Sequence, residues 1–296
     1  MIISASRRTD IPAFYAEWFY KRIECGYCVT RNPYNPKQVY RVSLNPKDVD
    51  AIVFWSKNPA PIIPGLSVLD DLGYKYYFQF TLNGYPDELE ANLPSLKERL
   101  KTFKTLSDMV GPKRVIWRYD PIIISTKTDY DFHRRKFSEI SGELAGKTAR
   151  VMVSFVEYYR KTIANLKKLE PLGYEFDTEA VDDSQSVSLL GDLAKTASMA
   201  GIEMLSCASA HDFSSVGIKA GRCIDAELIN GIWGLNLSQK KDPGQREFCQ
   251  CAVSRDIGVN DTCIHNCPYC YATKNHSLAV QRYKEHNPDL EYISGG

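Results

Sequence analysis

Short runs of β-branched and aromatic residues alternate with amphipathic stretches along nearly the whole chain. Such runs predict β-strands, and the stretches between them, with apolar residues three and four positions apart, predict helices. Parallel strands need a long crossover, which a helix usually supplies. The alternation therefore predicts an α/β fold built on a parallel sheet. The predicted strands are residues 1–6, 50–56, 74–82, 114–120, 150–157, 202–208 and 251–257.

The helical patterns fall between these strands. Repeated strand–helix units without a Gly-rich phosphate-binding turn favour a (β/α) barrel, closed or partly open, over a doubly wound sheet. No repeat, low-complexity tract or polar linker divides the chain, so we expect one domain over residues 1–296. The predicted helices lie near residues 12–24, 88–109, 130–145, 158–169, 184–199 and 271–285.

The charge and hydropathy of the 296-residue chain are those of an ordinary globular protein. Hydrophobic residues make up 44% of the chain and charged residues 25%, and the formal net charge is +1 at pH 7. This balance gives no overall basic field that would draw the protein to nucleic acid or to an anionic membrane. No apolar run is long enough to span a membrane, and the first ten residues lack the apolar core of a signal peptide. We therefore expect a cytoplasmic protein.

Polar side chains accumulate where several predicted strands end. In α/β barrels the carboxyl ends of the strands build the active site, so these side chains are candidate site residues. Some also fit ordinary structural roles: Asp10 is placed to cap a helix, and Asp120 before Pro121 is typical of a turn. The candidates are Arg7, Arg8 and Asp10; Ser56, Lys57 and Asn58; Arg118 and Asp120; and Ser154 and Glu157.

Three cysteines lie close together in the stretch NDTCIHNCPYCYATK, residues 260–274, at the spacing C-x3-C-x2-C. A structural zinc site usually needs four ligands and a disulfide needs two. A 4Fe–4S cluster is usually held by four thiolates, so three thiolates leave one iron open to an outside ligand. Cys263, Cys267 and Cys270 are therefore candidate cluster ligands. Pro268 fits the first turn of the helix predicted to follow, whose positive end would face the cluster.

Seven of the nine cysteines lie beyond residue 200. In a reducing compartment such crowding favours metal binding over disulfides. Outside the C-x3-C-x2-C stretch, four of these cysteines would make a full ligand set for a second cluster. The alternative is that they are buried thiols, because free cysteine is among the most buried residue types. These four are Cys207, Cys223, Cys249 and Cys251.

The three-cysteine spacing, with the aromatic residue Tyr269 just before the last cysteine, resembles the signature of radical S-adenosylmethionine enzymes. The resemblance implies that S-adenosylmethionine chelates the open iron, and that an electron from the reduced cluster cleaves it to give a 5′-deoxyadenosyl radical. It also implies a reductant such as a ferredoxin or flavodoxin, and a small-molecule or macromolecular substrate whose identity is unknown.

Further stretches resemble the recurring motifs of an uncharacterised prokaryotic domain-of-unknown-function family that ends in a cysteine cluster of this kind. The resemblance covers essentially the whole chain. The stretches are SASRRTDIPAFY, RNPYNPKQV, VFWSKNP, YYFQFTLNGYP, VIWRYDPI and SFVEYYRKT.

One feature departs from the radical S-adenosylmethionine pattern. In that superfamily the three-cysteine loop follows the first barrel strand, whereas here it follows the last predicted strand. A circular permutation reconciles the two: residues 251–257 would serve as the superfamily's first strand and residues 1–6 as its second. Arg7, Arg8, Thr9 and Asp10 would then fall where the superfamily binds the amino end of S-adenosylmethionine. The further candidates for holding S-adenosylmethionine or substrate are Arg118, Asp120, Lys57 and Glu157.

The sequence thus predicts a radical S-adenosylmethionine-type enzyme that carries one 4Fe–4S cluster, or two, on cysteines within residues 207–270, with the cysteine loop at 249–270. Two alternatives remain. One is an iron–sulfur electron-transfer protein without radical chemistry. The other is a zinc-stabilised binding module, in which His265 would complete a site of three cysteines and one histidine.

Overall fold

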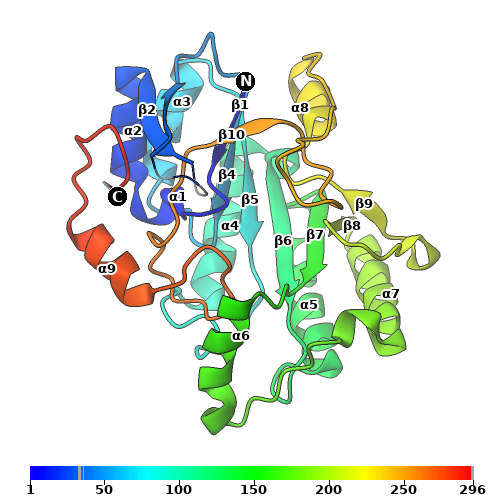
Figure 1. Cartoon of the computed structure of the whole chain (residues 1–296). Helices are drawn as coiled ribbons and strands as arrows, with labels where there is room; N and C mark the ends of the chain where they lie inside the picture. The colour runs from blue at the N-terminus through cyan, green and yellow to red at the C-terminus, as the bar shows by residue number, and fades with distance from the viewer. Residues whose placement is uncertain (33–34, 36, 295–296) are drawn as a thin grey trace.

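The computed structural model describes residues 1–32, 35 and 37–294, and an eight-stranded sheet lies at its centre (Figure 1). Neighbouring strands are parallel throughout, in the order β10-β1-β4-β5-β6-β7-β8-β9. From β1 to β9 the spatial order follows the chain without reversal, unlike the order of a doubly wound sheet. The strands are β1 (Ile2–Ala5), β4 (Ala51–Ser56), β5 (Tyr76–Thr81), β6 (Val115–Ile122), β7 (Arg150–Phe155), β8 (Glu203–Cys207), β9 (Lys219–Gly221) and β10 (Ser254–Asp256).

All seven predicted strands are present in this sheet, so the predicted α/β fold with a parallel sheet is confirmed. The closed form of the predicted barrel is wrong. β9 and β10 are the edges of the sheet, and no pairing joins them in the described residues. Each edge strand is only three residues long, so the hydrogen-bonded wall ends at both of them.

A small antiparallel sheet interrupts the strand–helix alternation and was not predicted. It pairs β2 (Tyr27–Arg31) with β3 (Val39–Ser43). Gly26 ends the preceding helix with φ 74°, a left-handed conformation that glycine adopts without steric cost. Cys25 is therefore the last residue of a helix and Cys28 is buried in β2.

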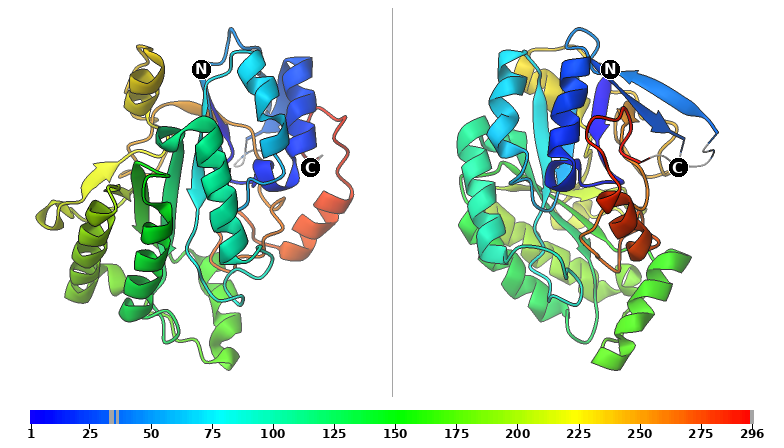
Figure 2. Two further views of the ribbon diagram at one scale, coloured as in Figure 1. Left: turned by 180° about the vertical axis from the view of Figure 1, so that it is seen from behind. Right: turned by 90° about the vertical axis from the view of Figure 1, so that its left-hand side faces the viewer.

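Side-chain caps begin several of the helices that cover the sheet. Ser95 and Glu98 form a capping box at the start of α4 (Leu96–Val110), and Asp183 caps α7 (Ser184–Met199). Seen from behind in Figure 2, α3, α4, α5 and α7 lie in front of the sheet. None of the helices among the described residues is long and apolar enough to cross a membrane. The helices are α1 (Ile11–Phe14), α2 (Ala16–Cys25), α3 (Leu66–Asp71), α4 (Leu96–Val110), α5 (Tyr130–Leu144), α6 (Arg160–Leu166), α7 (Ser184–Met199), α8 (Ala226–Trp233) and α9 (His276–Lys284), with 3-10 turns at Ile63–Gly65, Pro112–Arg114, Lys167–Leu172, Ala180–Asp182 and Ser214–Val216.

The two faces of the sheet carry different cores because side chains alternate along each strand. On β5, Phe78 and Phe80 belong to the large aromatic core beneath the helices. Tyr77, between Tyr76 and Phe78 in sequence, belongs to a smaller core on the opposite, inner face. That inner core also contains the segment around Cys223 and Cys251, so a long stretch of the C-terminal half covers the inner face.

The last strand of the chain lies beside the first. β10 pairs with β1 in parallel, with Ile2 opposite Ser254 and Ser4 opposite Asp256. The strands predicted over residues 251–257 and 1–6 are therefore neighbours, and the circular permutation stays a prediction. The consequence of this pairing is that two loops leave the same edge of the sheet side by side: residues 6–10 after β1, and the cysteine stretch after β10.

Candidate functional site

Inward-facing side chains become polar towards the carboxyl ends of the strands. On β6, Ile116 lies in the inner core, whereas Arg118 and Asp120, two and four residues later, carry charge. On β1 the inward-facing side chains likewise change from the apolar Ile2 to the polar Ser4. Because the strands are parallel, their carboxyl ends share one edge of the sheet. This polar edge is the candidate site.

The cysteine loop, residues 257–275, runs along this edge and is held by side-chain hydrogen bonds, most of them buried. Thr262 Oγ1 lies 2.7 Å from Thr9 Oγ1, and His265 Nε2 lies 2.7 Å from Asp10 Oδ2. Further along the loop, the Tyr269 hydroxyl donates to a buried carboxylate and the Tyr271 hydroxyl donates to the Arg7 carbonyl. Each of the three loop cysteines therefore lies within two residues of an anchored side chain.

The three loop cysteines, Cys263, Cys267 and Cys270, have partly exposed side chains. Among the described residues, no hydrogen bond links one of these thiols to another. Their sulfur atoms lie deep enough for burial to raise the pKa of Cys263, and to raise that of Cys267 to about 12 although Lys57 acts in the opposite direction. The free thiols of Cys263 and Cys267 are thus protonated at pH 7. Ligation therefore needs a metal that displaces the protons.

Asp10 and Thr9 hold the cysteine loop in place through hydrogen bonds. The Asp10 carboxylate accepts hydrogen bonds from Ala13 N at 3.0 Å, Ser56 Oγ at 2.7 Å and Lys57 N at 2.8 Å, in addition to its contact with His265. The helix-capping role predicted for Asp10 is confirmed. Thr9 Oγ1 donates to the Val259 carbonyl and accepts from Val259 N. Their contact with S-adenosylmethionine stays a prediction, and their polar atoms already have partners.

Lys57 belongs to a buried network that anchors Tyr269. Lys57 Nζ lies 2.7 Å from Glu90 Oε1 and 2.8 Å from the Tyr269 hydroxyl, which donates to the same Glu90 oxygen at 2.6 Å. Arg99 Nη2 lies 3.2 Å from the other carboxylate oxygen. Burial raises the pKa of Glu90, but Lys57 and Arg99 outweigh it and bring the pKa down to about 2.

Glu90 was missed because the sequence pattern places it in a helix predicted over 88–109, whereas α4 begins at Leu96. Apolar residues at Leu89 and Leu93 continue the helical spacing backwards into what is a loop. No sequence signal marks a buried carboxylate within such a stretch.

Asp256, at the end of β10, joins the two neighbouring loops. Its carboxylate accepts hydrogen bonds from Ser4 Oγ, Ser6 Oγ and Arg7 N, and pairs with Arg8 at 3.1 Å. Burial opposes ionisation, but Arg8 and the backbone N–H of Arg7 hold the pKa of Asp256 below its ordinary value. Asp256 was not among the predicted site residues, although the strand-end rule applied to residues 251–257 includes it.

Arg7 and Arg118 both make cation–π contacts with the ring of Trp55. Their guanidinium carbons lie 5.2 Å and 4.7 Å from the ring centroid of Trp55. Arg118 also pairs with Asp120, which accepts a hydrogen bond from Ser154. Among the described residues, Arg7 Nη2 and Trp55 Nε1 are buried without a hydrogen-bond partner. Two cations and two unused N–H donors therefore lie together on the inner face.

Glu157 lies at the surface, where its partner Arg246 is also near Cys207. Its side chain is 54% exposed and pairs with Arg246 at 2.5 Å. The structure therefore brings Lys57 beside the cysteine loop, and Arg118 beside Asp120, but places Glu157 at the surface. A catalytic role for these four residues stays a prediction.

The four remaining C-terminal cysteines meet on the inner face. Cys207 Sγ lies 3.1 Å from Cys223 Sγ, and the thiol of Cys251 hydrogen-bonds with those of Cys223 and Cys249. These hydrogen bonds lower the pKa of Cys251. Within residues 1–32, 35 and 37–294, no three or more His, Cys, Asp or Glu side chains already stand in the arrangement of a metal site. The predicted grouping of these four cysteines is thus present as a set of contacting thiols.

The helix expected to start near Pro268 begins later. α9 starts at His276, with Asn275 as its N-cap, and residues 268–275 form turns. The side chain of Asp261 accepts hydrogen bonds from Lys274 N and Asn275 N, which holds this segment in a non-helical path. The predicted alignment of a helix dipole with the three-cysteine loop is therefore wrong.

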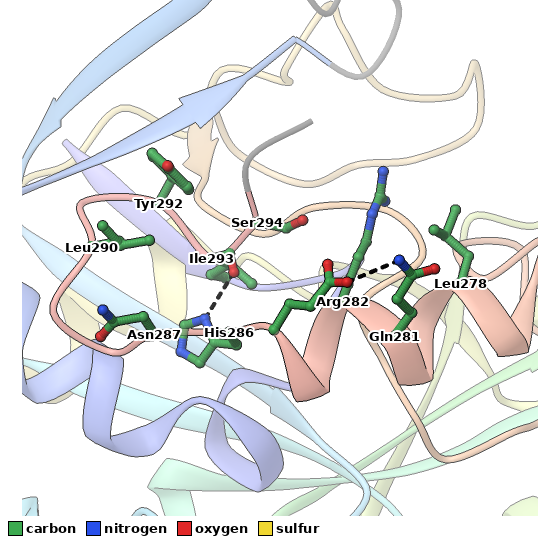
Figure 3. A pocket seen from close by; sticks show the side chains of 10 residues that line it. Leu278, Gln281, Arg282, His286, Asn287, Leu290, Tyr292, Ile293 and Ser294 are labelled. Atoms are coloured by element: carbon green, nitrogen blue, oxygen red, sulfur yellow. Dashed lines mark hydrogen bonds between the residues drawn. The ribbon is translucent and has the colours of Figure 1, made fainter.

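A cavity of about 360 Å³ lies between α9 and the chain that follows it (Figure 3). His286 Nδ1 contacts the Ile293 carbonyl at 2.8 Å, and Gln281 donates to Glu285 at 2.9 Å across its wall. None of the residues that line this cavity is a predicted site residue. It therefore belongs to the packing of the C-terminal segment and not to the polar edge.

Residues 2–272 match a family model described as Domain of unknown function (DUF1848). No curated protein matches the sequence significantly. The matched range includes the whole sheet, both sets of C-terminal cysteines and every predicted site residue.

Proposed function

The chain belongs to the DUF1848 family, a domain of unknown function, and on that premise we propose that it is a radical S-adenosylmethionine-type enzyme. Cys263, Cys267 and Cys270 would hold a 4Fe–4S cluster, and S-adenosylmethionine would bind its open iron. The observation that carries this proposal is the loop itself: three partly exposed cysteines at the polar edge of a parallel sheet, each beside an anchored residue.

The donor set fits such a cluster. Three thiols lie in one loop, none is hydrogen-bonded to another in the described residues, and the backbone N–H of His265 donates to the thiol of Cys263. Thiols that ligate a cube of four irons need to stand apart, because the cluster occupies the space between them, and N–H donors to sulfur tune such clusters.

The arrangement of the sheet agrees with a circularly permuted barrel. β10 would correspond to the superfamily's first strand, with its cysteine loop at the carboxyl end, and β1 to the second. The chain order then runs from β1 to β9 as in a partly open barrel wall. This correspondence and the organisation of residues 1–296 as one domain are parts of the proposal.

The chain's own side chains would have distinct tasks. When bound, the cluster and S-adenosylmethionine supply reductive cleavage to a 5′-deoxyadenosyl radical. Lys57 would place a positive charge beside the anionic cluster, since it lies near the thiol of Cys267. Arg7 and Arg118, stacked on Trp55, would bind an anionic group of S-adenosylmethionine or of the substrate. The covering segment of the inner face would exclude water from the reacting atoms.

One observation favours a second candidate, the zinc-stabilised module. His265 Nε2 contacts Asp10, and Nδ1 is buried without a hydrogen-bond partner among the described residues. A histidine oriented by a carboxylate through one nitrogen commonly binds metal through the other. His265 Nδ1 would then complete a site of three cysteines and one histidine.

Metal content and S-adenosylmethionine cleavage separate these candidates. The anaerobically purified protein should contain iron and acid-labile sulfide bound at the loop and, after reduction with dithionite or a stronger reductant, should convert S-adenosylmethionine to methionine and 5′-deoxyadenosine. Cys267→Ala should abolish cleavage, and Cys25→Ala, at the end of α2, should leave it unchanged. Zinc in place of iron at the loop would support the zinc module. Iron-loaded protein that neither binds nor cleaves S-adenosylmethionine would leave the electron-transfer alternative.

A further inference from the structure

Four cysteines from separate parts of the chain converge on the inner face near the β9 edge. Cys207 ends β8, Cys223 follows β9, and Cys249 and Cys251 lie in the segment that leads to β10. We propose that this set, which we call the thiol quartet, binds one tetrahedral metal ion of the zinc class. The site is separate from the three-cysteine loop and has a structural role.

The distances favour one ion over a cluster. Four thiolates around a single ion with metal–sulfur bonds of about 2.3 Å stand about 3.8 Å from one another. Cys207 Sγ and Cys223 Sγ are 3.1 Å apart, and the thiol of Cys251 hydrogen-bonds with those of Cys223 and Cys249. Ligation then requires the sulfur atoms of Cys207 and Cys223 to move apart by roughly 0.7 Å, which small side-chain rotations supply. A 4Fe–4S cube would have to push the thiols much further apart, because four irons lie between its ligands.

The surroundings suit a buried anionic site. Cys223 and Cys251 are 1% and 2% exposed, so a complex of four thiolates would lie out of water and need compensating charge and hydrogen bonds. Ile224 N donates to Cys251 Sγ at 3.3 Å, and Arg118 Nη1 donates to Cys223 Sγ at 3.6 Å. N–H donors of this kind orient and stabilise metal-bound thiolates. Arg7 adds positive charge near Cys251, and Arg246, which is paired with Glu157, lies near Cys207.

The position explains what such an ion would stabilise. Residues 234–253, between α8 and β10, contain no helix or strand, although they cover part of the inner face. A long irregular segment has few backbone hydrogen bonds to fix it, so a metal that ties Cys249 and Cys251 to β8 and β9 would supply its folding energy. The segment leads directly into β10 and the cysteine loop. A tetrahedral ion here would therefore tie the segment that leads into the proposed active site to β8 and β9.

Zinc, iron, sulfide and free-thiol counts on the full chain test the proposal. The wild type, purified anaerobically from medium containing both metals, should carry about one zinc per chain. The Cys263→Ala/Cys267→Ala/Cys270→Ala variant should keep that zinc while losing its iron. Cys223→Ser and Cys249→Ser should each reduce zinc to background, and Cys25→Ser should not.

Cobalt provides a measurement that does not depend on any variant folding. The wild-type chain loaded with Co²⁺ in place of zinc should show the intense sulfur-to-metal charge-transfer and visible bands of a tetrahedral tetrathiolate site. Three outcomes would overturn the proposal. These are wild type with no zinc and no such cobalt spectrum, a loop triple variant that retains iron and sulfide instead of zinc, and a thiol count two lower because Cys207 and Cys223 form a disulfide. Each leaves the iron of the three-cysteine loop to be judged separately.

Discussion

At the scale of single residues, the cysteine loop depends on a carboxylate that lies outside it. Glu90 is 3% exposed, yet it remains ionised because Lys57, Arg99 and the Tyr269 hydroxyl surround it. A buried ion pair contributes little net stability compared with an apolar replacement, but removing one partner leaves the others buried and uncompensated. The network therefore acts mainly as a fixed attachment for Tyr269, the neighbour of Cys270.

Glu90→Gln tests that attachment. The substitution keeps the size of the side chain but removes the charge that compensates Lys57 and Arg99, so the free energy of unfolding should fall by about 3 kcal/mol. Urea titration at pH 7 measures the change, and iron per chain should fall with it because the Tyr269 hydroxyl then donates to a neutral amide oxygen in place of a carboxylate. Glu88→Gln is the matched control: its carboxylate is 38% exposed and lies 3.8 Å from Lys127, so we expect less than about 0.5 kcal/mol. Equal effects of the two substitutions would contradict this role for Glu90.

At the scale of elements, the seam between β10 and β1 joins the two ends of the chain. β10 has only three residues, so few backbone hydrogen bonds hold it, and Ile257 N donating to Ser4 O at 3.1 Å is one of them. Asp256 adds side-chain hydrogen bonds to Ser4 and Ser6 and an ion pair with Arg8 across the same seam. The carboxylate thus replaces part of the backbone pairing that a longer strand would provide.

Asp256→Asn should therefore loosen the seam before it unfolds the protein. An amide cannot compensate Arg8, whose side chain is only 14% exposed, so we expect a loss of about 2 kcal/mol. Hydrogen exchange should show faster exchange in residues 254–258 and 2–5, with the β5 and β6 amides unchanged. Asp108→Asn, at an exposed pair on α4, is the control and should leave the exchange pattern as in the wild type. Uniformly faster exchange across the sheet would mean that the seam is not a separate unit.

The helices and strands also show which parts of the fold the sequence predicts. Seven strands were predicted because each is a compact β-branched or aromatic run, and that local signal survives folding. Whether the sheet closes was not predictable, since it depends on whether the two edge strands β9 and β10 pair with each other, and the local pattern of a strand does not encode its neighbours. The start of α9 was placed too early because Pro268 satisfies a helix-start rule, whereas Asp261, a distant residue in sequence, binds the backbone of Lys274. Likewise the meeting of Cys207 with Cys223 follows from strand order, which no spacing encodes.

At the scale of the whole molecule, the large apolar core lies on one face of the sheet and the candidate site residues lie on the other. The outer face is a continuous aromatic and aliphatic core under α3, α4, α5 and α7. The inner face carries the thiol quartet, Arg7, Arg118 and the cysteine loop. A titratable group buried beneath these helices offers a way to change global stability with pH.

His133 on α5 is that group. It is fully buried; its Nε2 lies 3.0 Å from the Ile123 carbonyl and so donates to it, and its Nδ1 accepts from the Tyr119 hydroxyl, so the ring is neutral. Burial lowers its pKa to about 4, below the value of 6.5 for an exposed histidine. The unfolded chain therefore binds a proton more readily between pH 6.5 and 4. The stabilisation is complete above pH 6.5 and is lost progressively as the pH falls through this window.

Urea unfolding should consequently give a free energy about 1 kcal/mol lower at pH 5.5 than at pH 7.5, from His133 alone. His133→Phe should remove that difference while lowering stability at both pH values, because the Tyr119 hydroxyl loses its acceptor. His211→Phe is the control: this histidine is 40% exposed and pairs with Asp182 at the surface, so the pH dependence of the wild type should persist. If His133→Phe keeps the full difference between the two pH values, the titrating group lies elsewhere and the outer core does not set the acid sensitivity of the fold.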